Sequence, residues 1–266
     1  FGFNRMTLRL WLMDLVKSSV IAAILGLPLL AAVVGLMRSA GPLWWLYAWL
    51  LWVTFNALVL VIYPTLIAPL FNRFEPLKDS GLADRIAALL QRTGFASKGV
   101  FVMDGSRRSA HGNAYFTGLG RAKRIVFFDT LVDRLQPQEI EAVLAHELGH
   151  FKLKHIAKRM AVSFVASLVF LVLLGFLAEQ SWFYIGLGVT PSLSGGNEGI
   201  ALVLFMLVLP VFTFPFAPVA SHLSRRHEFE ADAFAARHAS AQDLVSALVK
   251  LYEDNASTLT PDPIHS

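Results

Sequence analysis

The sequence has 266 residues, which is enough for one or two domains with a sizeable core. Hydrophobic residues make up 55% and charged residues only 16%, a balance that favours a membrane protein. The basic loops of such proteins also explain the net charge of +4 without nucleic-acid binding. Cysteine is absent, which excludes disulfides and thiolate zinc sites, so any metal must be held by His, Asp or Glu.

Four long stretches without a charged residue predict membrane-spanning helices. The stretches are Ser18 to Met37, Ser39 to Asn72, Met160 to Ala178 and Gly199 to Ser224. A spanning helix needs about 20 predominantly apolar residues, and each stretch is long enough. Buried core helices are the alternative, and the presence of four such stretches in one chain argues against them.

The basic residues are distributed unevenly among the polar segments. Residues 73–159 contain 15 Lys or Arg and 9 Asp or Glu, whereas residues 179–198 contain no Lys or Arg. The tail after Ser224 begins with Arg225 and Arg226. Because basic segments stay on the cytoplasmic side, the central polar region and the tail are both predicted to be cytoplasmic.

The central polar region is predicted to be a small α+β domain. Its expected elements are a helix over Leu82 to Thr93, strands over Gly99 to Met103 and Lys123 to Asp129, and a helix that begins at Pro137. The first has helical periodicity, the next two are rich in Val, Ile and Phe, and proline is favourable at a helix start. The glycine-rich loop Gly105 to Arg121 leaves room for one more short strand near residues 113–117.

The helix that begins at Pro137 carries the strongest chemical signal, His146-Glu147-Leu148-Gly149-His150. Positions i and i+4 share one helix face, so both imidazoles can hold one zinc ion, while Glu147 can act as general base on a water at the metal. By chance, this pattern occurs in roughly one chain in a hundred of this length. Two ordinary helix histidines are the alternative, and the apolar packing face of the segment argues against them. Gly149 costs about 1 kcal/mol in a helix interior, which predicts that something packs closely there.

A second helical segment, Arg225 to Asp232, offers the third ligand that a catalytic zinc normally has. Glu228 and Asp232 are again four positions apart, so one acid can bind zinc while the other orients a ligating histidine. Spacing alone leaves open which acid does which. His227 is a less favoured third ligand, and Glu230 is predicted to lie on the opposite, solvated face.

The remaining histidines and two basic clusters carry weaker predictions. Three histidines without a patterned partner are expected to be ordinary surface or core residues: His155, His222 and His238. His111, in the glycine-rich loop, either faces substrate or is a plain loop residue. The clusters Arg107-Arg108 and Arg121 to Arg124 are predicted to be solvated charge near lipid headgroups.

Together these features predict a mainly α-helical integral membrane protein with about four transmembrane helices and a small α+β zinc protease domain that has a short sheet. The predicted division is two transmembrane helices in residues 1–72, a cytoplasmic catalytic domain in 73–159, two transmembrane helices in 160–224, and a cytoplasmic helix with the third zinc ligand and a tail in 225–266. Both ends look truncated, since the sequence starts at Phe1 and stops in a loop-like run.

Seven runs of residues extend this pattern over essentially the whole chain: Phe1 to Asn4, Ile67 to Asn72, Gly105 to Ser109, His111 to Phe116, Lys123 to Leu131, His146 to His150 and Glu228 to Ala233. They resemble the type 1 CAAX prenyl endopeptidases, membrane zinc proteases that remove the last three residues of prenylated proteins. The combination is specific, because soluble metalloproteases do not join these runs to membrane spans.

The resemblance implies a role for five residues of the two helical motifs. His146, His150 and Glu228 match the zinc ligands of the family, with one zinc ion per chain. Glu147 matches its catalytic base. Asp232 matches the family's acidic residue that supports a ligating histidine without itself binding the metal.

The resemblance also implies where substrate binds and how the fold is arranged. Asn113 and Ala114 match an edge segment that pairs with the extended substrate backbone. The family fold is a ring of membrane helices around a chamber, with a gluzincin-like domain on the cytoplasmic side. Family members carry further helices before the Phe1 run and a His-Pro segment beyond the end of this sequence, so the chain is expected to bind zinc but to cleave poorly or not at all.

The leading hypothesis is a zinc-dependent membrane metalloendopeptidase that acts on peptides or proteins. The substrates of the family that it resembles are prenylated proteins. A quality-control membrane metalloprotease of the HtpX type is the runner-up, and a chamber-forming scaffold or transporter with a structural metal is the third hypothesis. The Leu-, Ala- and Gly-rich composition suggests a bacterial inner membrane, with the active site on the cytoplasmic side. The expected partners are substrate and lipid bilayer, without nucleic acid.

Overall fold

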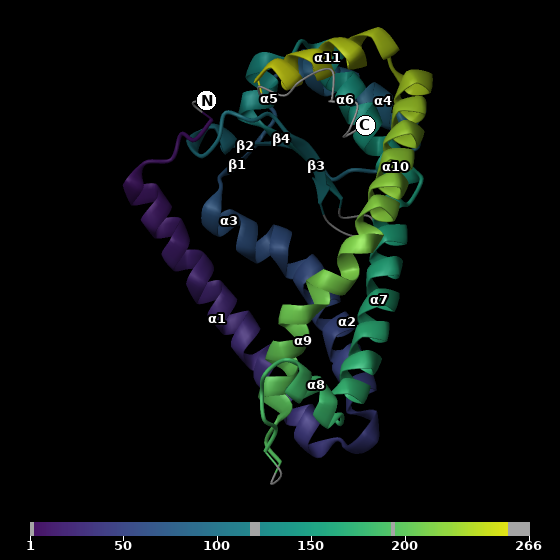
Figure 1. The fold of residues 1–266 in the computed structure, drawn as a ribbon. Coiled ribbons are helices and arrows are strands. Elements are labelled where there is room, and N and C mark those ends of the chain that lie inside the picture. The colour runs from purple at the N-terminus through teal and green to yellow at the C-terminus, as the bar shows by residue number, and fades with distance from the viewer. Residues whose placement is uncertain (1–2, 118–122, 193–194, 255–266) are drawn as a thin grey trace. The chain divides into compact units, whose positions relative to one another are not determined.

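The computed structural model describes residues 3–117, 123–192 and 195–254, and its elements are labelled in Figure 1. The chain forms two compact units. The first consists of Phe1–Asp14, Val59–His155 and Arg225–Ser266, and the second of Leu15–Leu58 and Ile156–Ser224. Four helices contribute residues to both units: α1 (Leu8–Ser39), α2 (Trp44–Ile62), α7 (His155–Leu177) and α10 (Ala217–His238).

Four helical segments of the described chain are long and apolar enough to cross a membrane: Leu8–Ser39, Gly41–Phe71, His155–Leu177 and Glu198–His238. Each overlaps one of the four uncharged stretches, so the prediction of four long apolar helices is confirmed. The last segment has 41 residues, about twice the length that a bilayer requires, and it becomes charged from Arg225 onward.

The second unit is apolar both inside and outside. It also contains α8 (Ser181–Gly186) and α9 (Glu198–Thr213). Its core is a cluster of large side chains: Trp44, Leu174, Phe183, Tyr184 and Phe205. Many other apolar side chains on the same helices are exposed, among them Val162, Val165, Val169 and Phe176. An apolar surface of this extent suits hydrocarbon rather than water.

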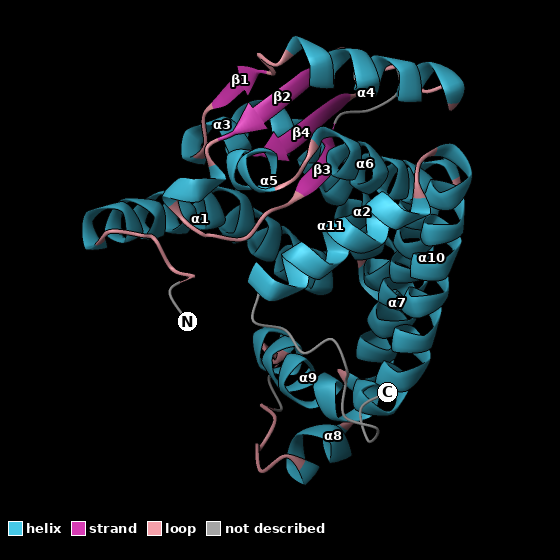
Figure 2. Cartoon of the chain, turned by 90° about the horizontal axis from the view of Figure 1, so that it is seen from above, coloured by secondary structure: helices cyan, strands magenta, loops and turns pink. Residues whose placement is uncertain are grey.

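The first unit contains a four-stranded mixed sheet with the strand order β1-β2-β4-β3, seen from above in Figure 2. Its strands are β1 (Phe74–Pro76), β2 (Val100–Met103), β3 (Ala114–Thr117) and β4 (Arg124–Phe128). β2 and β4 are parallel, and both outer pairs are antiparallel. The three expected strands are confirmed, whereas β1 has too few residues to show alternation in the sequence. Residues 118–122 of the glycine-rich loop, with Arg121, lie outside the described part.

Helices pack against this sheet to form the core of the first unit. They are α4 (Ser80–Arg92), α5 (Asp129–Arg134), α6 (Pro137–Lys152), α11 (Ala241–Asp254) and the last part of α10. The short helix α3 (Ala68–Phe71) precedes β1 in the chain. The core joins side chains from α4, β4, α6 and α11: Leu82, Ile86, Leu89, Ile125, Phe127, Ile140, Leu144, Leu148 and Leu244. The amphipathic periodicity of α4 and α6 therefore reflects a shared apolar core.

Helix α6 is fixed at its N-terminus by a buried carboxylate. Gln136 and Glu139 form a capping box, which satisfies backbone N–H groups that the first turn leaves unpaired. The Glu139 carboxylate also accepts hydrogen bonds from Ser246 at 2.6 Å and from Lys250 at 2.8 Å, both on α11. The helix expected at Pro137 thus begins there and is tied to its neighbour.

The N-terminal segment of the first unit is attached through Arg108. The Arg108 guanidinium donates to both carboxylate oxygens of Asp14, at 2.8 and 3.2 Å, and to Asn72 Oδ1 at 2.8 Å. Next to it, Asn4 pairs with Ser109 in an antiparallel bridge. The Arg108 side chain is only 20% exposed, so the prediction that it is solvated charge is wrong. Its partner is far away in the sequence, which is why a local pattern could not reveal the pair.

Candidate metal centre

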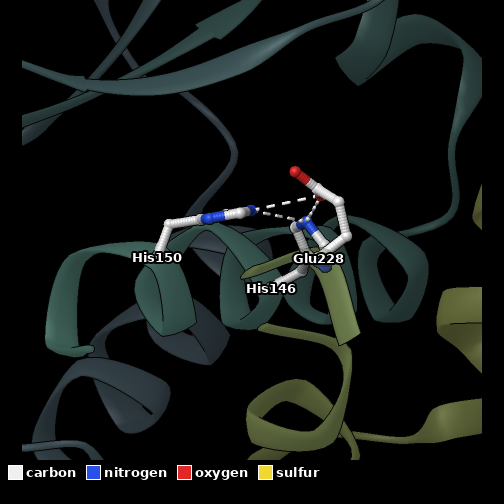
Figure 3. A group of neighbouring side chains, drawn as sticks. All are labelled: His146, His150 and Glu228. Carbon is white, nitrogen blue, oxygen red and sulfur yellow. Dashed lines mark hydrogen bonds and ion pairs between the residues drawn. The ribbon is translucent and has the colours of Figure 1, made fainter. Parts of the chain in front are cut away.

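Helix α6 places the imidazole rings of His146 and His150 on one face, one turn apart. Their Nε2 atoms lie 3.1 Å from each other. Glu228 Oε2, from α10, lies 3.4 Å from each of these nitrogens. Figure 3 shows the three side chains pointing toward one another. Within the described residues, these three side chains are the group that can hold a metal ion.

The spacing of the three atoms fits a tetrahedral metal ion. With metal–ligand distances of about 2.0–2.2 Å, neighbouring ligand atoms in a tetrahedral zinc site lie roughly 3.3–3.6 Å apart. The separations of 3.1, 3.4 and 3.4 Å are close to one face of such a tetrahedron. Three protein ligands leave the fourth corner for water or substrate, which is the arrangement of catalytic rather than structural zinc sites.

Asp232 lies one turn beyond Glu228 on α10 and contacts the other nitrogen of His146. The distance from His146 Nδ1 to Asp232 Oδ1 is 2.8 Å. An ionised carboxylate can only accept, so Nδ1 of His146 donates and the ring keeps its lone pair on Nε2. The geometry therefore gives the two acids different neighbours, with Glu228 at the two Nε2 atoms and Asp232 behind one ring.

Burial shifts the protonation of two groups on α6. Burial raises the pKa of the Glu147 carboxyl, an effect that His146 opposes and the Glu228 carboxylate adds to. Burial also lowers the pKa of His150, against the influence of Glu228. A lowered pKa favours the neutral imidazole, which is the form that binds a metal. A raised pKa brings a carboxylate closer to the range in which it exchanges protons near neutrality.

Gly149 allows α6 and α10 to approach closely. A Cβ atom at this position would lie 2.9 Å from Ala231 Cα, 3.1 Å from the Ala231 carbonyl oxygen and 3.1 Å from Phe234 Cβ. Such contacts are too short for any side chain, so only glycine fits without moving one helix. The predicted close packing at Gly149 is confirmed, and it brings the backbone of α10 against the helix that carries both histidines.

The two residues expected to bind substrate, Asn113 and Ala114, lie at the start of edge strand β3. The Asn113 carbonyl accepts a hydrogen bond from Phe128 N at 2.9 Å, and its side-chain oxygen accepts one from Ala114 N at 2.8 Å. Ala114 is buried and pairs with Phe127, whereas Asn113 is exposed. β3 pairs with β4 and ends the strand order, so its outer edge is where another extended backbone can add.

Sequence reasoning missed two residues beside the metal group, His155 and Glu230. His155 is 1% exposed, with one ring nitrogen 3.0 Å from His150 and the other 3.0 Å from Glu230. The prediction that Glu230 faces solvent on the far side of its helix is wrong, because α7 meets that face with His155. His227 is outside the metal group, and its ring stacks on His155 instead.

Comparison with known proteins extends these observations to the whole chain. Residues 76–266 match the model of peptidase family M48, and residues 1–73 match the model of the CAAX prenyl protease N-terminal region with five membrane helices. The curated protein "CAAX prenyl protease 1 homolog" of Arabidopsis thaliana is 37% identical over 270 residues, covering 100% of this chain and 62% of that protein. "CAAX prenyl protease 1" of Saccharomyces cerevisiae is 37% identical over 280 residues, covering 100% and 61%.

The fold comparison agrees with the family models. The crystal structure of S. mikatae Ste24p matches with a TM-score of 0.89 and 37% sequence identity, covering 100% of this chain and 64% of that one. The chain therefore spans somewhat less than two thirds of the proteins that it matches. The predicted fold class, an integral membrane protein with four long apolar helices and a small mixed sheet, is confirmed. With the M48 match over most of its length and the CAAX prenyl protease match over the rest, this chain belongs to peptidase family M48.

Proposed function

We propose that this chain forms the catalytic part of a zinc metalloendopeptidase that processes prenylated CAAX proteins at a membrane. The observation that carries the proposal is the triangle of His146, His150 and Glu228 atoms beside Glu147, in a member of peptidase family M48. Supporting this substrate, the relatives that match over the full chain are named CAAX prenyl proteases. The predicted division into domains at residues 72, 159 and 224 is part of the same proposal.

One zinc ion per chain would be held by His146, His150 and Glu228, with Asp232 behind His146. When bound, zinc supplies Lewis acidity toward a water molecule and the carbonyl of the scissile peptide bond. The protein's own contribution is to orient both imidazole rings through hydrogen bonds to their second nitrogens. The open geometry of a three-ligand set argues against the alternative of a scaffold with a structural metal.

Glu147 would act as the general base and then as the general acid. Its carboxylate takes a proton from the attacking water and later delivers that proton to the leaving amine. The raised pKa of Glu147, caused by burial, suits both roles, because a group that must accept and release a proton works best near the operating pH. Proton transfer of this kind typically contributes about 10²–10⁴-fold to the rate.

The substrate would bind as an added strand along β3, beginning at Asn113 and Ala114. Main-chain hydrogen bonds to a sheet edge hold a peptide in extended form regardless of most of its side chains. The excess of Lys and Arg in residues 73–159 favours a cytoplasmic location for this edge and for the metal site. The bacterial inner membrane remains a proposal from composition alone, since the matched relatives named above are eukaryotic.

Cleavage of a farnesylated CAAX peptide by the purified chain tests the proposal. The same peptide without its farnesyl group and the variant Glu147→Gln are measured in parallel. We expect cleavage of the farnesylated peptide, at least about 100-fold slower in Glu147→Gln with zinc content unchanged. Full activity of Glu147→Gln would contradict the proposed base. Equal cleavage of both peptides would instead favour a quality-control membrane protease.

A further inference from the structure

A second histidine contact lies behind the metal group. Helix α6 ends at Lys152, a turn follows in which Lys154 has a φ of 58°, and α7 starts at His155. This reversal returns the His155 ring to His150, and their two Nδ1 atoms lie 3.0 Å apart. Because His155 is almost completely buried, water does not compete for this hydrogen bond.

The other nitrogen of His155 faces a carboxylate. His155 Nε2 lies 3.0 Å from Glu230 Oε2, and Glu230 Oε1 accepts a hydrogen bond from Arg226 Nε at 3.0 Å. The ring of His227 stacks on His155 with centroids 4.1 Å apart and an angle of 12° between the planes. The His155 ring is therefore held along both nitrogen-bearing edges and across one face.

The protons in this chain of groups follow from what each atom can do. An ionised carboxylate only accepts, so Nε2 of His155 donates to Glu230. In a neutral imidazole the other nitrogen then accepts, so Nδ1 of His155 receives a hydrogen bond from Nδ1–H of His150. His150 consequently keeps its lone pair on Nε2, the atom that faces His146 and Glu228.

We propose that His155 and Glu230 are positioning residues of the metal site, which fix the tautomer and the ring orientation of His150. This inference rests on the proposed function and deepens it. Asp232 stands in the same relation to His146, so each ligand histidine has its own partner. Removing such a partner typically weakens metal affinity about 10- to 100-fold.

A purely structural role for His155 is the competing explanation. A buried histidine with both nitrogens hydrogen-bonded can simply stabilise the junction between α6 and α7. The substitution His155→Phe distinguishes the two explanations, because it keeps an aromatic ring but removes both nitrogens. The structural role predicts a less stable protein with an unchanged metal site, whereas the positioning role predicts weaker metal binding and altered ligand geometry.

The experiment compares three substitutions in the full chain, solubilised in detergent: His155→Phe, His155→Asn and Glu230→Gln. Zinc dissociation constants are measured by chelator competition, and the visible absorption of the Co²⁺-loaded protein reports the ligand geometry. His238→Phe is the matched control, because His238 also stacks on an aromatic ring and bonds a nitrogen, but to the Phe234 carbonyl of its own helix.

We expect His155→Phe to weaken zinc binding about 10- to 100-fold and to change the Co²⁺ spectrum. His155→Asn should recover part of the affinity, because its Oδ1 takes the place of Nδ1 as the acceptor for His150. Glu230→Gln should lie between the unsubstituted chain and His155→Phe, and His238→Phe should match the unsubstituted chain.

Two results would overturn the inference while leaving the proposed function intact. One is an unchanged zinc affinity and Co²⁺ spectrum in His155→Phe. The other is a loss in His155→Asn as large as that in His155→Phe, because the acceptor for His150 would then be irrelevant. Failure of the unsubstituted chain to bind zinc is a distinct result, which would remove the proposed function together with the inference.

Discussion

The two helices that carry the proposed metal ligands are held in very different ways. On α6, Ile140, Leu144 and Leu148 are all essentially buried, and the helix belongs to the central core of its unit. On α10, the Glu228 side chain is 50% exposed and Phe229 is 70% exposed. The core thus fixes both histidines, whereas Glu228, the proposed third ligand, depends on local contacts between α10 and its neighbours.

Those local contacts are concentrated within two turns of α10. Ala231 packs against Gly149, Asp232 bonds His146, and Glu230 bonds His155. Because Glu228 and Phe229 are themselves exposed, polar interactions near the metal group help to set the position of this part of α10 as well as its chemistry. Substitutions on the two helices should therefore differ in kind: on α10 they should change metal affinity, and on α6 they should change stability as well.

The largest expected effect separates the two acids of α10. Glu228→Ala removes the proposed third ligand and should weaken zinc binding by more than about 100-fold, beyond the usual cost of losing an outer partner. Asp232→Ala leaves three ligands in place and should weaken binding by about 10- to 100-fold. Chelator competition on both variants measures this order. Metal loss in Asp232→Ala with retention in Glu228→Ala would exchange the roles of the two acids.

The next largest effect concerns the contact between the helices. Gly149→Ala puts a methyl group within 2.9 Å of Ala231 Cα, so α10 must move away from α6. Overpacking costs typically about 1–3 kcal/mol, and the better helix propensity of alanine recovers up to about 1 kcal/mol of that. We expect a lower melting temperature together with weaker zinc binding, because Glu228 moves with α10.

Gly35→Ala is the control for that substitution. Gly35 lies inside α1, and a Cβ atom added there meets nothing within 4 Å. The same change should be neutral or slightly stabilising, because only helix propensity is affected. Equal destabilisation at both positions would show that the contact with Ala231 is not what requires a glycine at position 149.

The difference between the two helices also explains what the sequence could predict. The four spans and the two-histidine motif depend on local patterns, a run of about 20 apolar residues and a spacing of four on one helix face. The close contact at Gly149 could be inferred because glycine is costly inside a helix. All of these features depend on residues within one or two helical turns or within one continuous stretch of chain.

The missed features all join distant parts of the chain. His155 and Glu230 are 75 positions apart, and Arg108 and Asp14 are 94 apart. The helical spacing from Glu228 predicts only that Glu230 lies on the opposite face of α10. It could not show that α7 would cover that face with a histidine. The strand β1 escaped prediction for a related reason, because its pairing with β2 comes from tertiary structure.

A third prediction tests how firmly α6 is anchored at the end away from the metal group. Burial alone would raise the pKa of Glu139, but hydrogen bonds from Lys250, Ser246 and the Gln136 backbone outweigh it and lower the pKa below 4.5. Glu139→Gln should destabilise the protein by about 1–3 kcal/mol at neutral pH, because a buried donor set loses its charged acceptor. Zinc affinity should change little, since the ligands lie further along the helix.

The pH dependence of this effect has a definite sign. A carboxyl whose pKa is lower in the folded state stabilises the fold above its unfolded pKa of about 4.5 and loses this contribution as the pH falls through the folded value. The stability difference between Glu139→Gln and the unsubstituted chain should therefore shrink below about pH 4.5. In the control Glu75→Gln, an exposed pair with Lys78 is removed, so the melting temperature should stay the same. If the stability difference between Glu139→Gln and the unsubstituted chain stayed constant at all pH values, the charge of Glu139 would be ruled out as its cause.

The smallest expected effect lies on the exposed side of α10. Arg226 and Glu230 form an i,i+4 pair, but the Arg226 side chain is 71% exposed, and such pairs contribute about 0.3–0.5 kcal/mol. Arg226→Gln should leave the melting temperature nearly unchanged and shift zinc affinity by less than about threefold. If Glu230 depended mainly on Arg226 for its position, this substitution would weaken zinc binding as much as Glu230→Gln does. A clear gap between the two variants would instead show that buried His155, and not the exposed arginine, holds Glu230 beside the metal group.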